Sequence, residues 1–125
     1  MHLTAWVTLA VITVYLWTGF NVGKARTKYA VKAPSMDGPD EFMVRVRVQM
    51  NTLEQLPVVL APLWTCALFL GDSWAAAGGL LWCIGRVAYA LGYYHAPAKR
   101  EAGFVISLIA AMALIFGTAV GLLTH

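Results

Sequence analysis

The chain has 125 residues, of which 60% are hydrophobic and only 12% are charged, whereas soluble domains carry about 25% charged residues. So little polar surface excludes a water-soluble globular domain. The formal net charge of +3 therefore points to membrane topology rather than to nucleic-acid binding. A membrane-spanning helix needs about 20 predominantly apolar residues, and several such stretches predict a multi-pass integral membrane protein.

The apolar stretches predict an all-α fold, a bundle of four transmembrane helices in a single domain. The first span lacks a basic segment before it and is longer than the apolar core of a signal peptide, so we expect it to remain in the mature protein. The second begins near Pro39, where proline and two acids are typical of a helix start. Pro97 ends the third. The expected spans are residues 3–22, 41–70, 74–95 and 103–123.

Six of the nine lysines and arginines lie between the first two spans or between the last two. With four spans, these two connections share one side of the membrane. The positive-inside rule then predicts that the basic connections face the cytoplasm and that both termini face the other side.

Polar side chains within the spans form two stripes. At about 100° per residue, Arg47, Asn51 and Glu54 share one face of the second helix, whereas Gln49 points elsewhere. Arg86, Tyr89 and Tyr93 share a face of the third. Ionisable groups inside a membrane usually face protein or a wet cavity, so two stripes near the basic side predict a wet pocket between helices.

The same stripes have a second interpretation, in which the polar groups only satisfy one another. Arg47 would pair with Glu54, Arg86 would bind a carbonyl, and the tyrosines would lie at headgroup level. Periodicity leaves both interpretations open, and it leaves Glu54 as either a structural partner or a proton carrier.

Cysteines and glycines carry weaker signals. Cys66 and Cys83 lie in apolar runs and are expected to be small buried hydrophobic residues rather than disulfide partners or metal ligands. Two small-residue motifs predict close helix packing: Gly19-x-x-x-Gly23 and Gly117-x-x-x-Gly121.

The run from Arg45 to Pro57, RVRVQMNTLEQLP, resembles the signature of the MAPEG family, the membrane-associated proteins in eicosanoid and glutathione metabolism. The segment GPDEF at 38–42 resembles the family's entry into its second helix. The spacing of Arg86, Tyr89, Tyr93 and Arg100 resembles its third-helix pattern. The resemblance covers the chain from about Ala25 to the C-terminus.

The resemblance implies a homotrimer that binds glutathione between subunits, near the cytoplasmic face. Glutathione would be a co-substrate, conjugated to a lipophilic electrophile or used to reduce it as in detoxification, without a metal. Arg100 matches the family's thiolate-stabilising arginine, although a snorkelling helix-end cation is the alternative. The implied glutathione-binding residues are Arg47, Asn51, Glu54, Arg86, Tyr89 and Tyr93, with Arg26 and Gln49 contributing across the interface.

The residue types suit this ligand. Glutathione carries two carboxylates and one ammonium group, so its site needs arginines for bidentate carboxylate contacts and an acid for the amine. A thiol has a pKa of about 8.5 and only the thiolate is the nucleophile, so a guanidinium beside the sulfur would raise the reactive fraction.

Departures from the family leave the second substrate open. Gln55 stands where the leukotriene-synthesising branch has a tyrosine, and residues 94–99 also differ, so no leukotriene substrate is inferred. A xenobiotic or a lipid hydroperoxide fits the resemblance. The alternatives are a non-catalytic lipid-binding or scaffold member of the family and a proton-coupled exporter using Glu54, although such exporters would place their acid in the first span, which has none.

Overall fold

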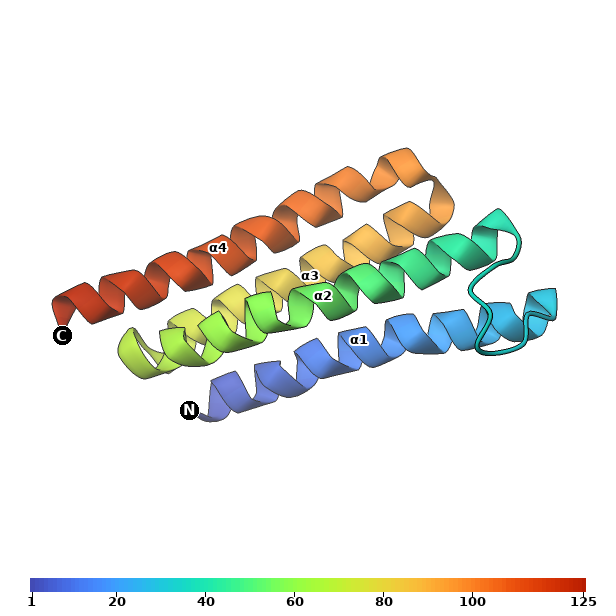
Figure 1. The fold of residues 1–125 in the computed structure, drawn as a ribbon. Helices are drawn as coiled ribbons and strands as arrows, with labels where there is room; N and C mark the ends of the chain where they lie inside the picture. The colour runs from blue at the N-terminus through green and yellow to red at the C-terminus, as the bar shows by residue number, and fades with distance from the viewer.

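The computed structural model describes residues 1–125 and contains helices without strands. The four long helices lie side by side, each running opposite to its neighbour in the sequence (Figure 1). All four are long and apolar enough to cross a membrane, which confirms the predicted four-helix membrane fold. The elements are α1 (His2–Tyr29), α2 (Asp40–Phe69), α3 (Asp72–His95), the short 3₁₀ helix η1 (Pro97–Arg100) and α4 (Glu101–Thr124).

The helices are longer than the apolar stretches that mark them. α1 continues past the expected end of its span at Val22 and stops at Ala30, which adopts a left-handed φ of 54°. Arg26 and Lys28 lie in its last turn, where cations interact favourably with the negative end of the helix dipole. α2 begins with Asp40 and Glu41 at its positive end.

Both basic connections lie at one end of the bundle. The segment between α1 and α2 and the η1 connection between α3 and α4 occupy the same end, whereas the two termini and the turn at Gly71 occupy the other (Figure 1). The charges of both connections are therefore gathered at one end of the molecule.

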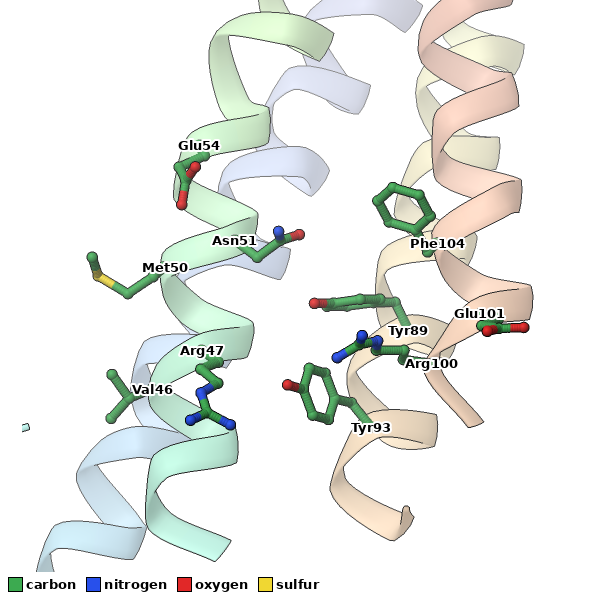
Figure 2. A pocket seen from close by; sticks show the side chains of 10 residues that line it. All are labelled: Val46, Arg47, Met50, Asn51, Glu54, Tyr89, Tyr93, Arg100, Glu101 and Phe104. Atoms are coloured by element: carbon green, nitrogen blue, oxygen red, sulfur yellow. The ribbon is translucent and has the colours of Figure 1, made fainter. Parts of the chain in front are cut away.

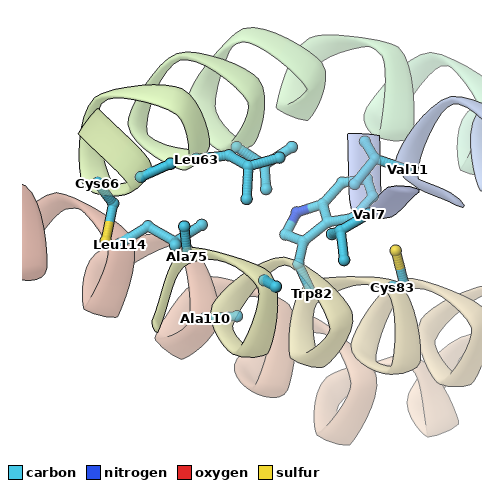
Figure 3. Close-up of a cluster of buried hydrophobic side chains, with 12 residues drawn as sticks. Val7, Val11, Leu63, Cys66, Ala75, Trp82, Cys83, Ala110 and Leu114 are labelled. Carbon is cyan, nitrogen blue, oxygen red and sulfur yellow. The ribbon is translucent and has the colours of Figure 1, made fainter. Parts of the chain in front are cut away.

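The main core lies between all four helices and contains 12 buried residues, including Trp82, Leu63 and Leu114 (Figure 3). Cys66 and Cys83 are both buried free thiols in this cluster, as the sequence predicts. Their surroundings are apolar side chains from neighbouring helices.

Glycines bring α4 close to its neighbours. A methyl group at Gly103 would lie 2.1 Å from the backbone nitrogen of Tyr89, so only glycine allows this approach of α4 to α3. The predicted close packing is also confirmed at Gly121, where a methyl group would lie 2.4 Å from the carbonyl oxygen of Phe69. Gly23, in contrast, faces open space with nothing within 4 Å. The Gly103 contact places the start of α4 beside the third-helix tyrosines.

Candidate functional site

An open groove of about 570 Å³ lies between α2 on one side and α3 with the start of α4 on the other (Figure 2). Its volume is in the range of about 300–1,000 Å³ that is typical of small-molecule sites. Its lining mixes charged, aromatic and apolar side chains: Val46, Arg47, Met50, Asn51, Glu54, Tyr89, Tyr93, Arg100, Glu101 and Phe104.

The α2 wall carries the first predicted stripe. Arg47, Asn51 and Glu54 all line the groove because their spacing of four and three residues places them on one helix face. Arg47 and Glu54 are exposed, and no ion pair joins them, because the one ion pair in the chain is Lys28–Glu41, at 3.7 Å. The interpretation in which Arg47 and Glu54 neutralise each other is therefore wrong for this structure.

The opposite wall is aromatic and cationic. The rings of Tyr89 and Tyr93 meet edge to face with centroids 5.7 Å apart. The Arg100 guanidinium lies 5.0 Å from the centre of the Tyr93 ring, a cation–π contact that holds its charge over the groove. The Phe104 ring lies 6.4 Å from that of Tyr89. Arg100, from the connection, thus lines the same groove as residues of both helical stripes.

Arg86 lies behind this wall rather than in it. Its side chain is only 1% exposed and does not line the groove. Its Nη1 donates a hydrogen bond of 2.9 Å to Oδ1 of Asn51, and its Cζ lies 4.1 Å from the centre of the Tyr89 ring. The expectation that Arg86 binds a carbonyl oxygen is confirmed, and that oxygen belongs to the side-chain amide of Asn51. The guanidinium is covered within this chain, and its implied direct contact with glutathione stays a prediction.

Two further predicted residues lie outside the groove of their own chain. Gln49 packs against α1, since a methyl group at Gly19 would lie 3.1 Å from Nε2 of Gln49. Arg26 donates a hydrogen bond of 2.7 Å to the carbonyl oxygen of Ser35 and lies 5.2 Å from the centre of the Phe42 ring. Their contribution across a subunit interface stays a prediction.

The structure adds four lining residues that the sequence analysis did not select: Val46, Met50, Glu101 and Phe104. Part of the signal was present. Val46 and Met50 precede Glu54 at spacings of four residues and so continue its helix face. Phe104 follows Arg100 by four residues. Extending each polar stripe to its apolar neighbours would have found these three residues.

The groove presents separated positive and negative charges. It offers two guanidinium groups, two carboxylates, an amide and two phenols around an apolar rim. Guanidinium groups bind carboxylates bidentately. No histidine or cysteine lines the groove, and no three His, Cys, Asp or Glu side chains in the chain lie close enough to hold a metal ion. Its chemistry is that of charge recognition beside an aromatic surface.

Comparison with known proteins agrees with this arrangement. A model of the MAPEG family matches residues 4–120. The chain is 40% identical over 119 residues to an uncharacterized protein of Synechocystis sp., covering 95% of this chain and 87% of that protein. It is 34% identical over 123 residues to leukotriene C4 synthase of Bos taurus, covering 98% and 82%. It is 39% identical over 89 residues to microsomal glutathione S-transferase 2 of Mus musculus, covering 71% and 60%. The chain belongs to the MAPEG family.

Proposed function

We propose that this protein is an integral membrane glutathione transferase, which binds glutathione in the groove and conjugates it to a lipophilic electrophile. Relatives named as a glutathione S-transferase and as leukotriene C4 synthase support the reaction class. The observation that carries the proposal is the groove's charge pattern, in which Arg47, Arg100 and Glu54 have no ion-pair partner within the chain.

That pattern complements glutathione. Arg47 would bind one carboxylate of the peptide through two parallel hydrogen bonds. Glu54, about two turns further along α2, would accept the ammonium group. Tyr89, Tyr93 and Asn51 would bind the backbone between them. Because its opposite charges are separated, the groove would bind a peptide with ionised ends more tightly than a neutral thiol.

Arg100 would stabilise the thiolate. Its guanidinium lies over the Tyr93 ring, and the exposed ring of Phe104 lines the same groove. A positive charge beside the sulfur lowers the pKa of the glutathione thiol, so its proton leaves to solvent at neutral pH. The thiolate then attacks the electrophile, a carbon–sulfur bond forms, and the leaving group departs or the addition product takes up a proton. With a lipid hydroperoxide, the same thiolate would attack the distal peroxide oxygen, so that the O–O bond breaks and the lipid alkoxide leaves and takes up a proton. The glutathione sulfenic acid formed would react with a second glutathione to give the disulfide and water.

The active assembly would be a homotrimer with its glutathione sites on the cytoplasmic side. The groove is open in a single chain, and Arg26 and Gln49 lie away from it. Their proposed contact with glutathione would therefore come from the neighbouring subunit. The basic connections at the groove's end of the bundle support the cytoplasmic orientation.

The test is the ultraviolet absorption of glutathione thiolate on mixing with the purified protein at neutral pH. Absorption above that of free glutathione, together with heat of binding in a calorimeter, is the expected result. S-methylglutathione, which has no thiol, should bind without new absorption. Binding without thiolate formation would favour a non-catalytic member of the family, and no binding at all would reject the proposal.

A further inference from the structure

Arg86 is a buried cation without a countercharge. It is 1% exposed, and its Nε and Nη2 atoms have no hydrogen-bond partner in the chain. The chain's one ion pair does not involve it. Moving a charge out of water costs free energy, and a site without a countercharge does not offset that cost. The burial of Arg86 therefore requires an explanation other than the stability of the fold.

Its two close contacts are both with residues of the groove. Nη1 donates to Oδ1 of Asn51 at 2.9 Å, and the guanidinium lies on the ring of Tyr89, 4.1 Å from its centre. Asn51 and Tyr89 project from opposite walls into the space between α2 and α3 (Figure 2). Arg86 therefore joins the two walls from behind.

The hydrogen bond from Arg86 determines which way the side-chain amide of Asn51 faces. A guanidinium has donors only, so the group of Asn51 that meets Arg86 has to be its carbonyl oxygen. The NH₂ group of Asn51, which lines the groove, is then turned away from Arg86. Without Arg86, either end of the amide could face the ligand.

We propose that Arg86 is a positioning residue, which sets glutathione affinity by holding the Asn51 amide with its NH₂ toward the groove. This inference rests on the proposed function and deepens it. The oriented amide selects a ligand group that accepts hydrogen bonds, such as a carbonyl or carboxylate oxygen of the peptide. Arg86 acts through Asn51 and does not touch glutathione.

The first test is a double-mutant cycle on glutathione binding, measured by calorimetry on the full chain in detergent. Arg86→Gln should weaken binding about tenfold, and Asn51→Ala should weaken it by a similar factor. In the Asn51→Ala background, Arg86→Gln should add no further loss. Two independent, multiplying losses would overturn the inference.

Arg45→Gln is the matched control. Arg45 also lies on a tyrosine ring, 4.7 Å from the centre of Tyr94, but it does not line the groove. Its substitution should leave the Kd for glutathione unchanged. An equal weakening by Arg45→Gln would show that any loss of an arginine–tyrosine contact has the same effect, and would overturn a specific role for Arg86.

The second test keeps Arg86 intact and so does not depend on the folding of its variants. Asn51→Asp would give Arg86 a carboxylate partner, so the Tm should hold or rise, while the groove loses its NH₂ donor and glutathione binding should fall at least tenfold. A glutathione affinity equal to the parent's in Asn51→Asp would overturn the inference about Arg86 and leave the proposed function standing. Absence of binding to the parent would overturn the proposed function, and the inference with it.

Discussion

The carboxylate of Asp72, at the start of α3, accepts hydrogen bonds from the backbone N–H and the hydroxyl of Thr4 at 2.8 Å and 2.6 Å. It also accepts the N–H of Leu3 at 3.2 Å. The first N–H groups of a helix have no partner within that helix. Asp72 therefore caps α1 from a distant part of the sequence and joins two helices at the end of the bundle opposite the groove.

Asp72→Asn should destabilise the protein, because it removes the negative charge and turns one acceptor into a donor. Loss of a helix cap costs about 0.5–2 kcal/mol, which should appear as a lower Tm in detergent. Thr4→Val, which removes only the hydroxyl bond, should cost less. Ser73→Ala is the neighbouring control, and glutathione affinity should not change. An unaltered Tm in Asp72→Asn would contradict the capping role.

Gly103→Ala should impair activity as well as stability. The added methyl group meets the backbone of Tyr89, so α4 has to move away from α3 and carry Arg100 and Phe104 with it. Overpacking of this kind costs about 1–3 kcal/mol. Gly23→Ala, at a site with open space, should leave the Tm and conjugation rate unchanged. Comparable losses in both variants would show that the α3–α4 contact is not the cause.

Glu54→Gln should weaken glutathione binding without lowering stability, because the Glu54 carboxylate has no ionic partner in the chain. A hydrogen bond to a charged group contributes about 1.5–3 kcal/mol, so the Kd measured by calorimetry should rise about 10- to 150-fold. A fall in Tm with unchanged affinity would assign Glu54 a structural role, the alternative that periodicity left open.

Arg100→Met should move the pH profile of conjugation toward that of free glutathione. In the parent, the nearby cation favours the thiolate, so the rate should stay high below the free thiol pKa of about 8.5 and fall only at more acidic pH. In the variant, the rate should rise with pH through that value. Lys99→Met, an adjacent cation outside the groove lining, should keep the parent profile. Identical profiles for Arg100→Met and the parent would remove Arg100 from thiolate stabilisation.

The ends of the helices show a limit of the sequence prediction. Apolarity predicts where the chain lies in lipid, but a helix continues as long as its residues favour helical geometry. α1 therefore extends from the expected end at Val22 through a basic segment to Tyr29, and α4 begins at Glu101, before its apolar span. Hydropathy marks the boundary of the membrane and not that of the helix.

The two sides of the groove were not equally predictable. Arg47, Asn51 and Glu54 share a face because of the helical repeat alone, which is a local property. Arg100 reaches the same groove because of η1 and because of the close contact of Gly103 with Tyr89. The rotation of α3 against α2 also places Arg86 behind Asn51, although it shares a stripe with Tyr89 and Tyr93.

The membrane class, the number of spans and the membership of each polar stripe were predictable from the chain alone, because apolar length and helical periodicity are properties of neighbouring residues. The packing of the helices was needed to show which of those residues reach the groove, which support it from behind, and which face away. These outcomes depend on how far and at what rotation the helices approach one another, and that is set by contacts between distant residues such as Gly103 with Tyr89 and Asp72 with Thr4.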